Sequence, residues 1–176
     1  MKVTSLKIPE VKLLEPKVFE DERGCFFESF NQKKFNELVE PGINFFQDNH
    51  SVSKKGVLRG LHYQDSPFAQ GKLVRVIFGE VFDVVVDIRK DSPTFGQWVS
   101  EILSTTNRKQ LWIPAGFAHG FLTLSDHSEF LYKTTMPHSK AHEKTIHYFN
   151  NAYEIDWPMK EVDIILSEKD QKAAKY

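Results

Sequence analysis

Apolar and polar residues alternate over many short stretches of this chain, which is the pattern of half-buried β-strands. In the stretch 81–89, four apolar side chains share one face, while Asp83, Asp87 and Arg89 share the other. A second apolar stretch, 72–78, comes directly before it. Further strands are expected at 13–19, 25–30, 45–52, 57–63, 97–103, 109–113, 120–125, 129–136 and 145–149.

Two short helices interrupt this β pattern. The first is expected at 31–39, where Pro41 and Gly42 end it, and the second begins near Ser167. Helical spacing gives the first helix an apolar face made of Phe35, Leu38 and Val39. Many short strands with few helices indicate an all-β sandwich or barrel, and we favour a jelly roll.

Length and composition fit one domain and exclude several classes of function. The chain contains no linker, internal repeat or low-complexity stretch, so residues 1–176 are expected to form a single domain. The formal net charge of −1 gives no overall attraction to nucleic acids or anionic membranes. Cys25 is the only cysteine, and no membrane-length apolar run or signal-peptide pattern occurs, so a cytoplasmic location is expected.

Two glycine-flanked histidines carry the most specific chemistry in the sequence. His62 lies in the motif Arg-Gly-Leu-His-Tyr-Gln at 59–64, and His119 lies in Pro-Ala-Gly-Phe-Ala-His-Gly-Phe at 114–121. Each could be a general base, an anion contact or a metal ligand, or could simply be packed in the core. A mononuclear metal site needs three or four converging His or carboxylate ligands, and neither motif supplies another one nearby. We therefore predict a site without metal.

Three further residues have ordinary structural explanations. Lys72 shares a face with the apolar residues of its strand, where a lysine usually extends its ammonium group to water. Tyr132 is expected in the core with its hydroxyl hydrogen-bonded. Asp170 follows Ser167 by three residues, which predicts a capping box at the start of the second helix.

Together with His62, however, these three residues suit proton abstraction next to a carbonyl group. His62 would remove the proton with Asp170 as its acidic partner, and Lys72 would stabilise the enolate oxygen. Tyr132 would return a proton to the opposite face of the carbon, which inverts the stereocentre. The sequence lacks the Gly-x-Ser-x-Gly motif of serine hydrolases and the glycine loops that bind phosphates. The candidate anion contacts are Arg23, Arg59 and His119.

Several blocks of the sequence resemble the dTDP-4-dehydrorhamnose 3,5-epimerases, a cupin-like family of sugar-nucleotide epimerases. The resemblance extends from Leu14 to Asp170. Its most specific blocks are DERG (21–24), QDNHS (47–51), VLRGLH (57–62), GKLV (71–74), GEVFDV (79–84) and PAGFAHGF (114–121). So many blocks in the same order are far more than chance similarity would produce.

The resemblance implies a jelly-roll homodimer that needs neither metal nor cofactor and binds a dTDP-linked 4-keto-6-deoxy sugar. Its reaction would invert C3 and C5 to give dTDP-4-dehydro-L-rhamnose, for dTDP-L-rhamnose and polysaccharide synthesis. It assigns His62 as the base, Asp170 as its partner, Tyr132 as the acid, and Lys72 as the cation near the enolate. The implied substrate contacts are Arg59 and His119 at the diphosphate; Arg23, Glu28, Gln47, Asn49, His138 and Glu143 around the nucleotide and sugar; and Phe26, from the partner subunit, on thymine.

One stretch departs from the family pattern, and other functions stay open. Where these enzymes often carry two tyrosines that hold the nucleotide, this chain has Met136-Pro137-His138, so the preferred base stays open. The alternatives are an epimerase that acts at C3 or C5 alone or on a differently substituted 4-keto-6-deoxy sugar, a 3,4-ketoisomerase of the same fold, and a non-catalytic sugar-nucleotide-binding module. The presence of both His62 and Tyr132 argues against the last two.

Overall fold

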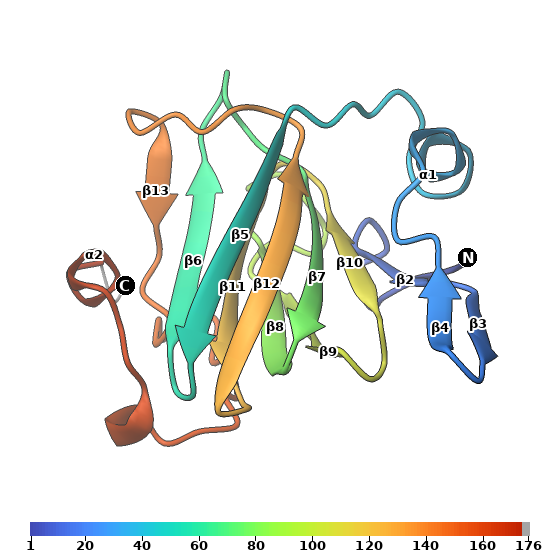
Figure 1. Cartoon of the computed structure of the whole chain (residues 1–176). Helices are drawn as coiled ribbons and strands as arrows, with labels where there is room; N and C mark the ends of the chain where they lie inside the picture. Colours follow the sequence, from blue (N-terminus) through green and yellow to red (C-terminus); the bar gives the residue numbers. More distant parts are fainter. Residues whose placement is uncertain (174–176) are drawn as a thin grey trace.

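Two antiparallel β-sheets face each other in the computed structural model, which describes residues 1–173 (Figure 1). The larger sheet has six strands in the order β1-β2-β10-β7-β12-β5, and the smaller has five in the order β13-β6-β11-β8-β9. The main core lies between them and contains Val74 and Phe130 from the larger sheet and Val85 and Phe121 from the smaller. The chain is therefore the all-β jelly roll that its alternating pattern predicted.

The strands of the six-stranded sheet are β1 (Lys2–Ser5), β2 (Lys12–Glu15), β10 (Gln110–Ile113), β7 (Lys72–Phe78), β12 (His127–Thr134) and β5 (Gln47–Lys54). Those of the five-stranded sheet are β13 (Glu143–Thr145), β6 (Leu58–Gln64), β11 (Phe117–Thr123), β8 (Glu80–Asp87) and β9 (Trp98–Ser104). The remaining elements are the hairpin β3 (Val18–Asp21) and β4 (Gly24–Phe27), helices α1 (Gln32–Leu38) and α2 (Glu168–Gln171), and the 3-10 turn η1 (Glu161–Asp163).

The structure differs from the expected strands mainly near the N-terminus. The single strand expected at 13–19 is two strands, β2 and β3, separated at Pro16 and Lys17. Proline has no backbone N–H to donate to a ladder, so the change of sheet falls at this position. Strand β1 was not expected, and the strand expected at 145–149 is found at Glu143–Thr145, as β13. The second helix does begin after Ser167, as predicted.

Strand β8 is buried on both of its faces. Val84 and Val86 pack against a second core formed with the segment 146–166, while Asp83 and Asp87 are fully buried on the other face. The alternation of 81–89 therefore does not separate a core face from a solvent face. Because a buried carboxylate must be hydrogen-bonded to be tolerated, each of these aspartates is expected to have a specific partner.

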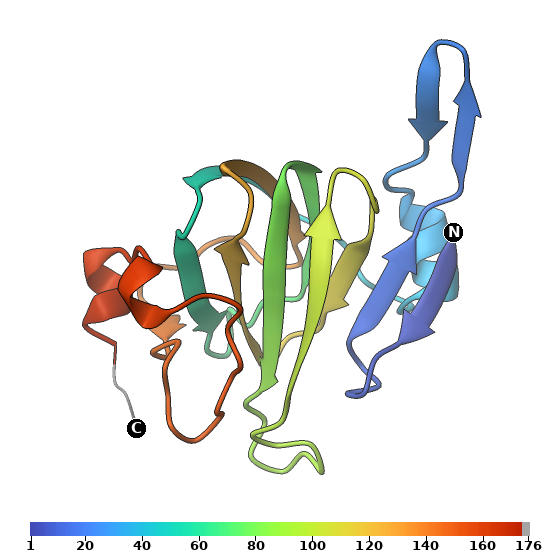
Figure 2. The ribbon, with the colours of Figure 1, turned by 90° about the horizontal axis from the view of Figure 1, so that it is seen from below.

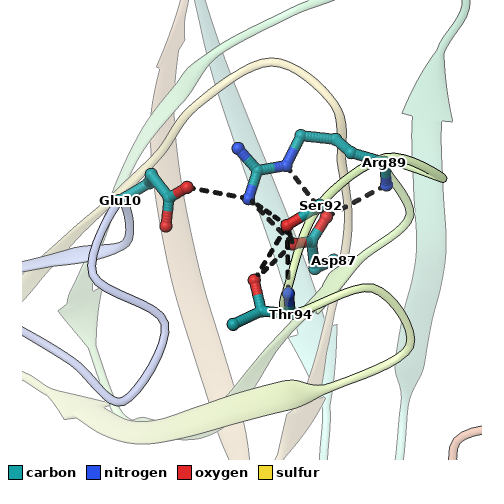
Figure 3. Close-up of polar contacts among 5 residues, drawn as sticks. All are labelled: Glu10, Asp87, Arg89, Ser92 and Thr94. Carbon is teal, nitrogen blue, oxygen red and sulfur yellow. Dashed lines mark hydrogen bonds and ion pairs between the residues drawn. The ribbon is translucent and has the colours of Figure 1, made fainter.

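Asp87 finds its partners in the loop that follows β8 (Figure 3). Its carboxylate accepts hydrogen bonds from Arg89, Ser92 and Thr94, at 2.6–2.8 Å for the shortest contact of each. Arg89 also donates to Glu10, which ties this loop to the N-terminal segment. Burial alone would raise the pKa of Asp87, but these hydrogen bonds outweigh it and hold the pKa well below its usual range. The cluster thus stabilises one end of the sandwich.

The hairpin formed by β3 and β4 stands away from the two sheets (Figure 2). Phe26 on this hairpin leaves 72 % of its surface exposed, an unusual position for a large aromatic side chain. Helix α1 follows the hairpin, begins at the N-cap Asn31, and buries Phe35 against Trp112. Leu38, expected on the same buried face, is instead half exposed, while Val39 does pack against the cluster that contains Phe35.

Candidate active site

Two glycines allow β6 and β11 to approach closely beside the two motif histidines. A Cβ atom on Gly60 would lie 2.5 Å from the Cα of Gly120, so neither position tolerates a side chain. Gly60 also adopts a φ of +132°, which strongly favours glycine. Next to this contact, His62 and His119 are direct neighbours across the ladder. The glycines of both motifs therefore serve strand packing, which brings the histidines together.

The histidines lie in a cavity of about 370 Å³ between the two sheets. Phe121 of the smaller sheet and Phe130 of the larger stack with ring centres 4.1 Å apart and form part of its wall. Six predicted site residues also line this cavity: Arg59, His62, Lys72, His119, Tyr132 and Asp170. The fold thus assembles side chains from four strands and one helix around a single space.

His62 is paired with Asp170 at the edge of this cavity. The Nε2 of His62 lies 2.6 Å from the Oδ1 of Asp170. Ser167 accepts a hydrogen bond from the backbone N–H of Asp170 and donates its hydroxyl proton to the Oδ2 of the same residue. Ser167 is thus the N-cap as predicted, but the carboxylate turns to His62 and to the serine hydroxyl. Burial would raise the pKa of Asp170, but the contacts with His62 and Ser167 lower it below the usual value.

Lys72 and Tyr132 face the histidines from the opposite sheet. Lys72 is only 8 % exposed, so the expectation that it reaches water was wrong. Its Nζ donates to the backbone carbonyl of His62 at 3.2 Å, and burial lowers its pKa to about 8 despite attraction from Asp83 and Glu143. Burial raises the pKa of Tyr132, so its phenol keeps its proton over a wide pH range. The site therefore sets a protonated phenol and an ammonium group opposite a histidine–carboxylate pair.

Asp83 is a site residue that the sequence analysis missed. Its two carboxylate oxygens lie 3.0 and 2.9 Å from the Nε2 of His119, and both side chains are buried. Burial raises the pKa of Asp83 and lowers the pKa of His119, and both shifts favour the uncharged forms of the two side chains. The attraction between the two groups acts in the opposite direction, because it favours their charged forms, but the effect of burial is larger. A signal was available: Asp83 shares its strand face with Val81 and Val85, an unusual position for an unpaired carboxylate.

A second, smaller cavity of about 110 Å³ adjoins the first and shares His62, Lys72 and Tyr132 with it. Four more predicted contacts line it: Gln47, Asn49, His138 and Glu143. The side chain of Gln47 connects these residues, since it donates to Asn49 at 2.8 Å and accepts from the backbone N–H of His138 at 3.0 Å. These four predicted contacts thus gather beside the predicted catalytic groups.

Three predicted contacts lie outside both cavities. Arg23 is in the turn of the projecting hairpin and pairs with Asp21. Glu28 follows β4 and pairs with Lys34 at 2.8 Å, while Phe26 points to solvent. The chain therefore does not bring these residues to its own cavity.

Residues 1–173 contain no group of three or more His, Cys, Asp or Glu side chains arranged to hold a metal ion. None of the helices in this part of the chain is long and apolar enough to cross a membrane.

The pattern of the dTDP-4-dehydrorhamnose 3,5-epimerase family matches residues 5–176 of this chain. The chain belongs to this family. It is therefore an enzyme of the isomerase class, which confirms the resemblance found in the sequence. A relative of the same name from Shigella flexneri is 57 % identical over 176 residues, which cover all of this chain and 96 % of the relative.

Solved structures are similar to this chain over almost its whole length. A dTDP-6-deoxy-D-glucose-3,5-epimerase from Legionella pneumophila, in complex with dTDP-4-keto-L-rhamnose, is 53 % identical with a TM-score of 0.94, covering 98 % of this chain and 90 % of that one. A 3'-monoepimerase from Streptomyces bikiniensis, in complex with dTDP-quinovose, is 31 % identical with a TM-score of 0.89, covering 96 % and 85 %. The family fold is thus shared by enzymes of different regiochemistry.

Proposed function

We propose that this enzyme inverts C3 and C5 of dTDP-4-dehydro-6-deoxy-D-glucose to give dTDP-4-dehydro-L-rhamnose. The observation that carries the proposal is the opposed pair of His62, held by Asp170 on one side of the cavity, and Tyr132 on the other. The two come from different sheets, so a sugar ring between them would present opposite faces to a base and to an acid. The names of the Shigella and Legionella relatives support the same reaction.

The first step is removal of the proton from the carbon next to the C4 carbonyl. His62 takes this proton through Nδ1, because its Nε2 is bonded to Asp170, while the C–H electron pair moves to form the enolate and leaves negative charge on the C4 oxygen. The carboxylate of Asp170 orients the imidazole and stabilises its cationic form. Lys72, with a pKa lowered to about 8, is mostly protonated at neutral pH and offers its charge to the enolate oxygen.

The second step returns a proton from the other face. Tyr132 donates its phenolic proton to the carbon as the enolate collapses to the ketone, which leaves the inverted stereocentre and a phenolate. The proton taken by His62 and the one lost by Tyr132 are exchanged with solvent, so the cycle balances without any redox partner. The same pair of groups serves C3 and C5 in turn, because both carbons flank the carbonyl.

In this proposal the substrate extends over both cavities, because its diphosphate contacts line the first cavity and its other nucleotide and sugar contacts line the second. Arg59 and His119 contact the diphosphate, while Gln47, Asn49, His138 and Glu143 surround the nucleotide and sugar. The protein acts as a homodimer, in which Arg23, Phe26 and Glu28 on or beside one protomer's hairpin complete the site of its partner. The exposure of Phe26 on a projecting hairpin supports this arrangement. A single exposed cysteine, Cys25, agrees with a reducing cytoplasm.

The deciding experiment is incubation with the 4-keto sugar nucleotide in D₂O, following deuterium at C3 and C5 separately by NMR. We expect deuterium at both carbons and the L-configured product. Deuterium at one carbon only would instead make the chain a monoepimerase like its Streptomyces bikiniensis neighbour. Binding of the sugar nucleotide without any deuterium exchange would mean that the chain is a non-catalytic sugar-nucleotide-binding module.

A further inference from the structure

Helix α2, which carries Asp170, has only four residues, too few to be stable without contacts to the rest of the protein. The chain before it is held to the sheet, because the backbone N–H of Leu58 donates to Ile165 and Ile165 donates to Gly56. Within the helix, Asp170 itself is the single buried residue. No apolar side chain of α2 therefore fixes how the helix is turned about its axis.

Two consecutive residues of α2 make charged contacts with two neighbouring strands. Asp170 contacts His62 on β6, and the Nζ of Lys169 lies 2.7 Å from the Oε1 of Glu143 on β13. Thr145 of β13 lies opposite His62, and Glu143 is two residues before Thr145, so His62 and Glu143 project from the same face. The helix thus rests beside the sheet edge at β13, as Figure 1 shows.

The geometry of a helix explains why the second contact matters. Successive side chains of an α-helix point about 100° apart, so one contact leaves the helix free to turn and two divergent contacts do not. The Lys169–Glu143 pair is partly exposed, with 44 % and 26 % of the side chains accessible, so its direct contribution to global stability is small. Its effect should instead be local, on the direction of the Asp170 carboxylate.

We propose that Lys169 is a positioning residue, whose ion pair with Glu143 sets the rotation of α2 and thereby holds Asp170 against His62. The inference rests on the proposed function and deepens it, because Lys169 would act on the general base His62 through the side chain of Asp170. Glu143 then has two tasks, since its other oxygen, Oε2, lies 3.7 Å from His138 in the second cavity. The Glu143 carboxylate thus connects the second cavity, where nucleotide and sugar contacts are proposed, with the general base His62.

The test compares Lys169→Met with Lys172→Met. Lys172 lies at the end of the same helix and pairs with the exposed Glu168, so its replacement removes an equal charge without touching β13. We expect Lys169→Met to lower kcat by about tenfold with KM changed by less than about twofold, because misorientation of the base costs rate and not binding. Lys172→Met should behave like the unchanged protein, and Lys169→Arg should retain most of kcat.

Two further readouts separate positioning from a simple charge effect. The first is the split between kcat and KM, because misorientation of Asp170 lowers kcat, whereas loss of a cation that attracts the substrate raises KM. A raised KM with unchanged kcat would show a substrate contact instead and would overturn the proposal.

The NMR signal of the His62 ring proton shared with Asp170 tests the contact without any substrate. We expect this signal to weaken through faster solvent exchange in Lys169→Met and to persist in Lys172→Met. An unchanged signal in Lys169→Met would overturn the positioning role. Absence of deuterium exchange in the unmodified protein would refute the proposed function, while this spectral comparison would still decide the role of Lys169.

Discussion

The Nε2 of His62 lies 2.6 Å from the Oδ1 of Asp170, although 108 residues separate the two in the sequence. The carboxylate side chain is 4 % exposed and the imidazole 28 %, so the contact is largely shielded from water while the ring still reaches the cavity. A shielded carboxylate supports its partner more strongly than an exposed one. The pair therefore has the arrangement expected of an oriented general base.

Replacement of either member of this pair should affect catalysis differently. His62→Ala should abolish deuterium exchange at both carbons, because the other imidazole at the cavity wall, His119, is buried and bonded through Nε2 to Asp83. Asp170→Asn should leave a folded enzyme with a rate about 10²-fold lower, since the imidazole loses its orientation and charge support. Exchange rates and thermal unfolding would be measured together. A lower Tm with intact turnover in Asp170→Asn would mean that Asp170 only caps α2.

Tyr132 and His62 should prove to have separate tasks. Tyr132→Phe keeps the ring in its place but removes the phenolic proton. We expect this variant to exchange deuterium into the 4-keto sugar with the original configuration largely retained, while the yield of the L-configured product falls sharply. Configuration and isotope content would be followed in one NMR time course. Equal loss of exchange and inversion would indicate that Tyr132 positions the substrate.

Lys72 should give the reaction an alkaline limit. Its buried ammonium has a pKa lowered to about 8, so the cation that stabilises the enolate is lost as the pH rises through this value. The exchange rate should therefore fall above about pH 8, and Lys72→Met should suppress exchange at every pH. Residual exchange in Lys72→Arg should persist to higher pH, because a guanidinium stays charged. An unchanged alkaline limb in Lys72→Arg would assign the limb to another group.

Activity should not depend on a metal ion. Enzyme treated with a strong chelator and then freed of it should epimerise at its original rate, because the proposed steps use only His62, Asp170, Lys72 and Tyr132. Initial rates before and after treatment give the answer. A loss of rate that a divalent ion restores would contradict this prediction.

Asp87 should matter for stability and not for chemistry. Asp87→Asn should lower the free energy of unfolding by about 2–3 kcal/mol, because Arg89 loses a charged hydrogen-bond partner in a buried setting. The difference in unfolding free energy between Asp87→Asn and the unchanged protein should be largest at neutral pH. It should shrink as the pH falls below about 4, because folding lowers the pKa of Asp87. Denaturant titrations at several pH values test this. The exposed Asp91 of the same loop is the control, and Asp91→Asn should change little.

Which residues form strands could be predicted because that information is local. Alternation along 72–78 and 81–89 depends only on neighbouring side chains, and both stretches are strands in the structure. The sequence blocks around His62 and His119 were also sufficient to find the family. The split of 13–19 into β2 and β3 was not predicted, because the two strands belong to different sheets, and sheet membership is not a local property.

By itself the sequence determined the β-rich class, the two histidine motifs and the family, since these follow from residue types and short spacings. Only the tertiary structure decided that Lys72 is buried in a cavity, that Asp83 is the partner of His119, and that Asp170 turns from its cap toward His62. The physical reason is that each of these contacts joins elements far apart in the chain. Their geometry depends on how two sheets pack, and no local pattern records that packing.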